Sequence, residues 1–312
     1  MVSTVGVLAQ CLQRITAESR GWLVPLALGG NEVAATVRLM TSSTVYLSVG
    51  PDDVVLSLHP PRQDLPIPRS PTSIHLGEWG FVSDLYAGAP ARLSHGDLSI
   101  STRGGDITCS LTEAPVWRPY RNQTGQEFES AVVANALEEL APIQEARHRL
   151  GSRVDKLVCV LMDSRKSLVR SATGELQTAI DALVGFGPGL TPSGDDVLVG
   201  CLLGLTRWGY PEAPLSAFRA AIVDRLRADN ATTFVGRHVL AHACVGVGHE
   251  AIENLLQTPG DHDFVGFQSA ISQLLGVGAT SGADTLLGLR AALHVLDPDG
   301  AVPSRRNEKD SR

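Results

Sequence analysis

Hydrophobic and polar positions follow two different patterns along this chain. Between residues 22 and 117, short runs of apolar and β-branched residues are separated by Gly, Pro and Asp. Such runs predict strands, and the expected ranges are 33–40, 44–49, 54–58, 91–93, 98–101 and 106–111. Several short strands with regular turn signals indicate a small barrel or sandwich. The proline-rich segment 59–71 predicts a long loop.

From residue 122 onwards, apolar residues recur at spacings of three and four, which predicts helices. The expected helices cover 126–150 with a break at Pro142, 166–184, 197–205, 214–229, 232–245, 250–256, 264–275 and 283–296. Segment 153–163 is ambiguous between helix and strand. Residues 4–19 also have helical spacing and predict a short amphipathic helix with Val7, Leu8, Cys11, Leu12 and Ile15 on one face.

These patterns together predict an α+β protein with an N-terminal β-rich barrel or sandwich-like domain followed by a mostly α-helical domain. The β-rich domain, with its short N-terminal helix, is expected over residues 1–120. The helical domain is expected over 121–302, and the charged segment 303–312 is expected to be a disordered tail.

Composition narrows the class of protein. The chain has 312 residues, of which 43% are hydrophobic and 19% charged, so it can bury a sizeable core. Its net charge of -7 disfavours nucleic acid or an anionic membrane as the main partner, since both favour a basic face. Five well-separated cysteines fit neither a disulfide framework nor a zinc ribbon. No targeting or membrane-spanning segment is recognisable, and we expect a soluble cytoplasmic protein.

The main candidate for a functional site is the stretch GFGPGLTPSGDD at residues 185–196, which is followed by the apolar run 197–205. Its glycines and prolines exclude a helix interior, so it is a shaped loop. Ser193 or Asp195 is suited to cap the helix that follows. The start of a helix offers unpaired backbone N–H groups and the positive end of the helix dipole, and can therefore hold an anion.

A second copy of the motif lies 88 positions later. The pattern Ser-Gly-x-Asp-x-Leu-x-Gly of residues 193–200 recurs at residues 281–288, and glycine precedes both copies, at Gly189 and Gly278. The two copies indicate either a duplicated helical unit or two helix starts that converge on one site. The simpler alternative is that Ser and Asp only cap two buried helices. Because Asp195 and Asp196 add negative charge, they could instead position a cation.

Other candidate chemistry is weaker. His238 and His242, with His249 as a third ligand, could bind a metal, but the segment HVLAH lacks the glutamate of a zinc peptidase motif. Thr232 and Thr233 resemble a further helix cap. No lysine follows the glycine loop as in a P-loop, and no dinucleotide-binding fingerprint or Gly-x-Ser-x-Gly elbow is present. We therefore predict no metal and no cofactor, with a divalent cation such as magnesium as the alternative.

The stretch Gly187-x-Gly-Leu-Thr-Pro-Ser-Gly-Asp-Asp196 resembles the signature of a domain-of-unknown-function family. That family includes the small subunit of the three-component oxamate carbamoyltransferase of allantoin catabolism, a purine ureide pathway. Residues 278–288 are similar to the family's C-terminal motif, and a β-rich first half that closes at residues 115–119 also matches. The resemblance implies carbamoyl transfer between oxamate and phosphate through carbamoyl phosphate, with partner subunits that carry part of the site.

On this basis we assign candidate site residues. The first anion-binding set is Gly187, Gly189, Thr191, Ser193 and Gly194, and the second is Thr280, Ser281 and Gly282. Asp195, Asp196 and Asp284 are the candidate catalytic residues, which would orient the substrate amine or a cation. The expected ligand is a small anion such as phosphate, oxamate or carbamoyl phosphate, and the expected assembly is a hetero-oligomer.

One difference from ordinary carbamoyltransferases keeps a second hypothesis about function open. The chain lacks the Ser-x-x-x-x-Arg-Thr phosphate motif of ordinary carbamoyltransferases. A non-catalytic assembly or small-anion-binding protein that scaffolds partner subunits therefore remains the second hypothesis.

Overall fold

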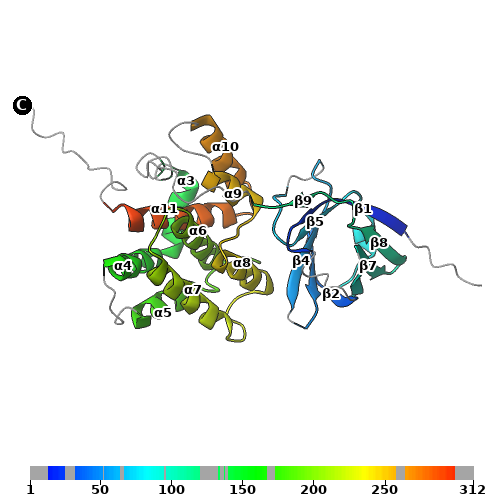
Figure 1. Ribbon diagram of the computed structural model, residues 1–312, viewed down its shortest axis with the longest axis horizontal. Helices are drawn as coiled ribbons and strands as arrows, with labels where there is room; N and C mark the ends of the chain where they lie inside the picture. The colour runs from blue at the N-terminus through cyan, green and yellow to red at the C-terminus, as the bar shows by residue number, and fades with distance from the viewer. Residues whose placement is uncertain are drawn as a thin grey trace, which may run out of the picture. The chain divides into compact units, whose positions relative to one another are not determined.

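The computed structural model describes residues 13–24, 32–51, 53–63, 67–94, 96–119, 133, 137, 140–166, 173–257 and 264–298. The chain divides into two compact units, within residues 1–118 and 119–312, and each has its own hydrophobic core. The first unit is built from strands and the second from helices (Figure 1). The predicted α+β class, with a β-rich part followed by a mostly helical part, is confirmed.

Eight strands of the first unit close into a mixed barrel. The strands are β1 Gln13–Gly21, β2 Val33–Met40, β3 Val45–Val49, β4 Val54–His59, β5 Ser73–Leu76, β6 Pro90–Ser94, β7 Asp97–Thr102 and β8 Gly105–Ser110. Their order is β1-β5-β4-β3-β2-β6-β7-β8, and β1 closes the barrel because it pairs antiparallel with β5 and parallel with β8. The short strand β9, Val116–Trp117, continues beside β1.

The barrel core explains which strands the sequence could predict. Side chains such as Val37, Leu47 and Leu98 alternate with more exposed neighbours and are fully buried. All six predicted strands are present. Strands β5 and β9 were not predicted. Strand β5 is only four residues long, contains a buried histidine and follows the proline-rich loop.

The predicted helix over residues 4–19 is wrong for the part that the structure describes. Residues 13–21 form strand β1, in which Ile15, Ala17 and Ser19 are buried while Arg14 and Glu18 are exposed. This two-residue alternation fits a half-buried strand, and pairing with β5 and β8 stabilises it. Val7, Leu8, Cys11 and Leu12 lie outside the described residues.

Nine helices occur in the described part of the second unit. They are α3 Ala141–Leu150, α4 Ser152–Lys166, α5 Thr173–Asp181, α6 Ser193–Arg207, α7 Glu212–Leu226, α8 Phe234–Cys244, α9 Glu250–Gln257, α10 Phe264–Leu275 and α11 Ser281–Leu296. The ambiguous segment 153–163 is helical. Pro142 lies in the first turn of α3, where proline is tolerated. Residues 126–132 and the tail 303–312 fall outside the described residues.

Helices α6 and α11, which carry the two sequence motifs, pack side by side through glycines (Figure 1). A Cβ at Gly200 would lie 2.0 Å from the carbonyl oxygen of Thr285, and one at Gly288 would lie 2.1 Å from that of Val197. Further along, a Cβ at Gly204 would meet Ala292. Because the contacts advance in the same direction on both helices, the pair is parallel and its two N-termini lie at the same end.

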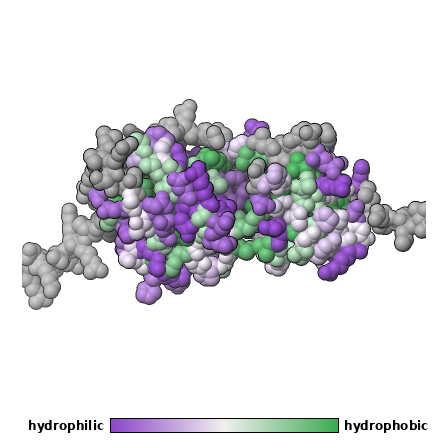
Figure 2. All heavy atoms as spheres, turned by 90° about the horizontal axis from the view of Figure 1, so that it is seen from below, coloured by the Kyte–Doolittle hydropathy of each residue, from purple (hydrophilic) through white to green (hydrophobic). Residues whose placement is uncertain are grey.

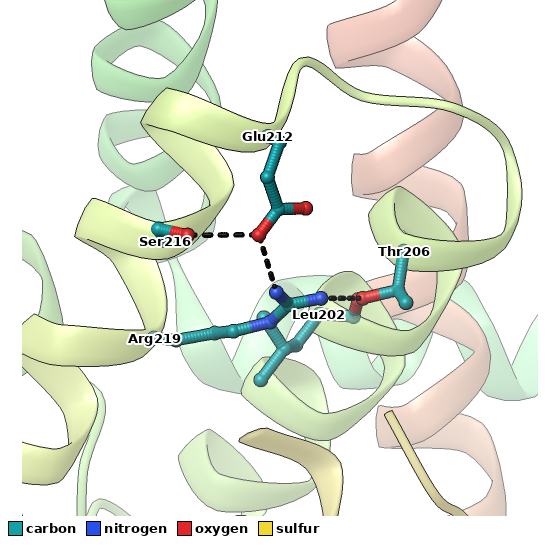
Figure 3. Close-up of polar contacts among 5 residues, drawn as sticks. All are labelled: Leu202, Thr206, Glu212, Ser216 and Arg219. Atoms are coloured by element: carbon teal, nitrogen blue, oxygen red, sulfur yellow. Dashed lines mark hydrogen bonds and ion pairs between the residues drawn. The ribbon is translucent and has the colours of Figure 1, made fainter. Parts of the chain in front are cut away.

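Polar contacts hold the other end of α6 against α7 (Figure 3). Arg219 donates to Glu212 at 3.0 Å and to the hydroxyl of Thr206 at 3.2 Å. Ser216 also donates to Glu212, and Thr206 donates to the carbonyl of Leu202. The C-terminal half of α6 is thus fixed from two sides, by α7 and by α11.

The close helix contact generates a stability prediction. We expect Gly200→Ala or Gly288→Ala to lower the free energy of unfolding by about 3 kcal/mol, because each new methyl would collide with backbone of the other helix. The measurement is urea unfolding followed by circular dichroism at 222 nm, which reports the helical unit.

Gly174→Ala in α5 is the matched control, since a Cβ there meets nothing within 4 Å. It should change stability by less than about 1 kcal/mol and in the stabilising direction. Equal effects of the three substitutions would contradict the close packing of α6 against α11.

Candidate functional site

The loop before α6 has a backbone that only glycine adopts without strain. Gly185, Gly187 and Gly189 have φ angles of 75°, 110° and 101°, all in the left-handed region. A Cβ at Gly187 would also lie 2.9 Å from the backbone nitrogen of Ser193. The N–H groups of Gly187, Gly189 and Thr191 have no backbone hydrogen-bond partner among the described residues. Since Gly189 is exposed, this loop can present N–H groups to a ligand.

The loop before α11 repeats this construction. Gly278 has a φ of 61° and lies against Ser281, as Gly187 lies against Ser193. Gly278 and Thr280 are exposed, and the N–H groups of Thr280 and Ser281 have no backbone partner among the described residues. Both helix starts are therefore accessible at the surface of the unit.

Gly194 and Gly282 have a packing role in both motifs. A Cβ at Gly194 would lie 2.0 Å from the carbonyl oxygen of Leu183, and one at Gly282 would lie 1.9 Å from that of Leu274. Their N–H groups donate inside the protein, to Phe186 at 2.8 Å and to Val277 at 3.1 Å. These two N–H groups are thus already used, and the glycines instead let each loop fold onto its helix.

The two motifs meet in space. The hydroxyl groups of Thr191 and Ser281 are 2.8 Å apart and hydrogen-bonded to each other. Both hydroxyls also interact with the carboxyl group of Asp196. The sequence left open whether the two helix starts converge, and the structure brings them together at this contact.

Two buried carboxyl groups lie beneath the contact. Asp196 is 4% exposed and Asp284 is completely buried. Burial raises the pKa of Asp196 well above its usual range; hydrogen bonds from Ser281 and Thr191 oppose the shift, and the charge of nearby Asp284 adds to it. The Oδ2 atom of each aspartate is buried without a hydrogen-bond partner among the described residues. Burying an oxygen without a hydrogen-bond partner costs free energy, and two such oxygens lie together in this pair of carboxyl groups.

Two arginines from α3 and α4 reach the site, and the sequence analysis missed both. Arg149 donates to Oδ1 of Asp284 at 2.8 Å, and its side chain is 38% exposed. The guanidinium carbon of Arg153 lies 3.9 Å from the ring centre of Phe186, in the first loop. No motif links these arginines to loops so distant in sequence, so only the packing of the helices could reveal them.

Asp195 differs from Asp196 because both of its oxygens are used by the protein. Oδ1 accepts from the N–H of Gly185 at 2.8 Å, and Oδ2 accepts from the hydroxyl of Thr232. Burial raises its pKa, while these hydrogen bonds and the charge of Arg225 lower it. The hydroxyl of Thr233 donates to the carbonyl of Leu190. Asp195 and the two threonines therefore fix the shape of the first loop.

The interpretation of the motifs as simple helix caps is wrong. The cap positions of α6 and α11 are Pro192 and Thr280, and neither helix has a side-chain cap hydrogen bond. Ser193, expected as a cap, is 5% exposed and lies inside the first turn. By contrast Thr233 does cap α8, since its hydroxyl accepts from the N–H of Gly236 at 2.8 Å.

The histidine hypothesis gains no support from the geometry. The rings of His238 and His242 touch, with centres 4.0 Å apart, and burial lowers both pKa values, that of His242 to about 4. Within the described ranges, no three His, Cys, Asp or Glu side chains are arranged to hold a metal ion.

Two further observations concern the surface of the helical unit and the character of the helices. Hydrophilic side chains dominate the face of this unit that Figure 2 shows. In the parts of the chain that the structure describes, no helix has both the length and the apolar character that a membrane span requires.

The buried acid pair generates a pH prediction. Because the pKa of Asp196 is higher in the folded than in the unfolded chain, the folded state binds more protons above about pH 4 and loses stability as the pH rises towards the folded pKa. Asp196→Asn removes this loss, because the amide does not ionise. The stability of Asp196→Asn relative to wild type should therefore increase from pH 4.5 to pH 8.

Urea unfolding of both proteins at the two pH values measures this difference. Asp155→Asn, which removes an exposed carboxyl group, is the control and should show no such trend. If the stability of Asp196→Asn relative to wild type is the same at both pH values, the raised pKa of Asp196 is contradicted.

Comparison with known proteins gives one family. Residues 183–293 match the family model described as oxamate carbamoyltransferase subunit AllH. The matched range begins just after α5, includes both loops and ends within α11. Comparisons with curated proteins and with solved structures found no match. The resemblance predicted from the two motifs is thus confirmed: residues 183–293, which contain both motifs, are similar to the family of oxamate carbamoyltransferase subunits called AllH.

Proposed function

We propose that this protein is a subunit of a carbamoyltransferase of nitrogen catabolism and binds a small carbamoyl-containing anion where α6 and α11 begin. One observation carries the proposal: the two motifs within the matched family region meet at Thr191 and Ser281, above a pair of buried aspartates with unpaired oxygens. The family description names oxamate as the substrate class.

The chemistry of the site suits such a ligand. Oxamate and carbamoyl phosphate each combine an anionic group with a primary amide or carbamoyl group. The anionic group needs donors, which the loop N–H groups at Gly187, Gly189 and Thr191, the helix dipoles and Arg149 can supply. The NH₂ group needs acceptors, and the unpaired oxygens of Asp196 and Asp284 are acceptors.

Each candidate residue then has a role. Thr191 and Ser281 orient the carbamoyl group, with Asp196 and Asp284 below it. Ser193, Gly194, Thr280 and Gly282 shape the two helix starts, and Asp195 holds the first loop in place. N–H groups directed at the carbamoyl oxygen would stabilise the negative charge that develops there during transfer. A magnesium ion bound by the two carboxylates is the alternative occupant.

The remaining parts of the proposal concern assembly and location. We propose that partner subunits complete the active site, because the family description is that of a subunit. A cytoplasmic location and a place in purine ureide breakdown belong to the same proposal.

A scaffold without catalytic activity is the second candidate. The observation in its favour is that both loops have exposed residues and that side-chain hydrogen bonds hold the first loop in shape, as a docking surface for partner subunits requires. On this alternative, the loops bind protein and the isolated chain has no affinity for small anions.

Thermal unfolding separates the two candidates. We expect oxamate or carbamoyl phosphate to raise the melting temperature of the full chain, because a ligand at 100 times its Kd stabilises the folded state by about 2.7 kcal/mol. Ser281→Ala and Thr191→Val should reduce this rise by at least half.

Ser272→Ala in α10 is the matched control, since that exposed hydroxyl donates to the carbonyl of Gln268 in its own helix. It should leave the ligand effect unchanged. Absence of any rise in wild type, with a rise only when partner subunits are added, would contradict a binding site within this chain and favour the scaffold.

A further inference from the structure

The helical unit contains an internal repeat, which is visible both in the sequence and in the contacts between two helices. Helix α6 with the loop before it forms one copy, and α11 with the loop before it forms the other. Within the two helices, equivalent positions are 88 residues apart, as in the pairs Gly194 and Gly282, Asp196 and Asp284, and Gly200 and Gly288. Each member of the last pair touches the residue equivalent to the one its partner touches, Thr285 or Val197. The two copies are therefore related by a pseudo-twofold axis between α6 and α11.

This symmetry has a direct consequence for ligand binding. Any group that the first loop can hold has an equivalent position on the second loop, at the other side of the Thr191–Ser281 contact. The unpaired Oδ2 atoms of Asp196 and Asp284 are equivalent in the same way. Two half-sites thus face one shared centre.

We infer that the two loops hold two different anions at the same time, phosphate on the loop before α6 and the carboxylate of oxamate on the loop before α11. This inference rests on the proposed function and extends it by assigning a donor and an acceptor position. A transfer needs both reactants side by side, and a duplicated site places them on either side of Asp196 and Asp284.

Differences between the copies indicate which anion belongs to which loop. The first loop is three residues longer, counted from Leu183 to Ser193 and from Leu274 to Ser281, and it has left-handed glycines at both 187 and 189. The first loop also has more N–H groups without a backbone partner among the described residues, and these suit the three free oxygens of a phosphate. The second copy has Arg149 bound to its aspartate, and a planar guanidinium matches a carboxylate with two parallel hydrogen bonds.

The transfer between these positions balances without any further reactant. The reactants of this step are N-carbamoyl oxamate, held by its carboxylate, and phosphate. The bond between the carbamoyl carbon and the oxamate nitrogen breaks, a bond from that carbon to a phosphate oxygen forms, and the products are oxamate and carbamoyl phosphate. One proton moves from the phosphate to the oxamate nitrogen, and the reverse reaction returns it. Asp196, which interacts with Thr191 of the first loop and Ser281 at the start of α11, lies where its carboxyl group can carry this proton.

Isothermal titration calorimetry on the full chain tests the inference. We expect saturating phosphate to change the Kd of oxamate by less than threefold, because the two anions occupy different loops. Gly189→Ala should weaken phosphate at least tenfold and leave oxamate unchanged. Arg149→Lys, which keeps the charge on Asp284 compensated, should weaken oxamate at least tenfold and leave phosphate unchanged.

Gly209→Ala is the control for backbone strain. Gly209 has a φ of 81°, similar to the 101° of Gly189, but lies between α6 and α7 and should affect neither anion. If both anions bind but compete, or if each variant weakens both equally, the two-site inference is wrong while the proposed function stands. If neither anion binds to wild type, both proposals are wrong.

Discussion

The close parallel contact between α6 and α11 is the interaction on which the site depends. Because Gly200 and Gly288 have no side chains, the two backbones approach until each glycine touches a carbonyl of the other helix. Parallel packing then places both helix N-termini at one end, with their positive dipole ends together. The acidic residues Asp196 and Asp284 in the two first turns compensate this arrangement. A wider or antiparallel helix pair would separate the two motifs.

The free-energy cost of burying these carboxyl groups falls mainly on Asp196. Asp195 is fully hydrogen-bonded and Asp284 has an ion pair with Arg149, so the protein stabilises both within its own structure. Asp196 is different, because burial and the neighbouring carboxylates oppose its ionisation. Like Asp284, it also has one buried oxygen without a hydrogen-bond partner in the described part of the chain. Local costs of this kind are typical of functional sites, where a ligand supplies the missing contacts.

The sequence predicted those features that local patterns determine. Alternation and helical spacing revealed most strands and helices, and the repeated Ser-Gly-x-Asp pattern indicated two related helix starts. Strand β1 was predicted as a helix because its pairing with β5 and β8 is a long-range effect. Arg149 and Arg153 were missed for the same reason, since they reach the loops only through the packing of α3 and α4. The convergence of Thr191 and Ser281 likewise follows from the glycine contacts, whose partners the sequence does not identify.

The central claim is that the two motif loops form one ligand site, and cross-linking tests it most directly. A Thr191→Cys, Ser281→Cys double variant, with the exposed Cys159 replaced by serine, places two thiols where the hydroxyls are now 2.8 Å apart. We expect an intramolecular disulfide under mild oxidation, slower formation in the presence of oxamate or phosphate, and loss of ligand binding until the disulfide is reduced. Two free thiols after oxidation, or a cross-linked protein that binds both anions as wild type does, would contradict the account.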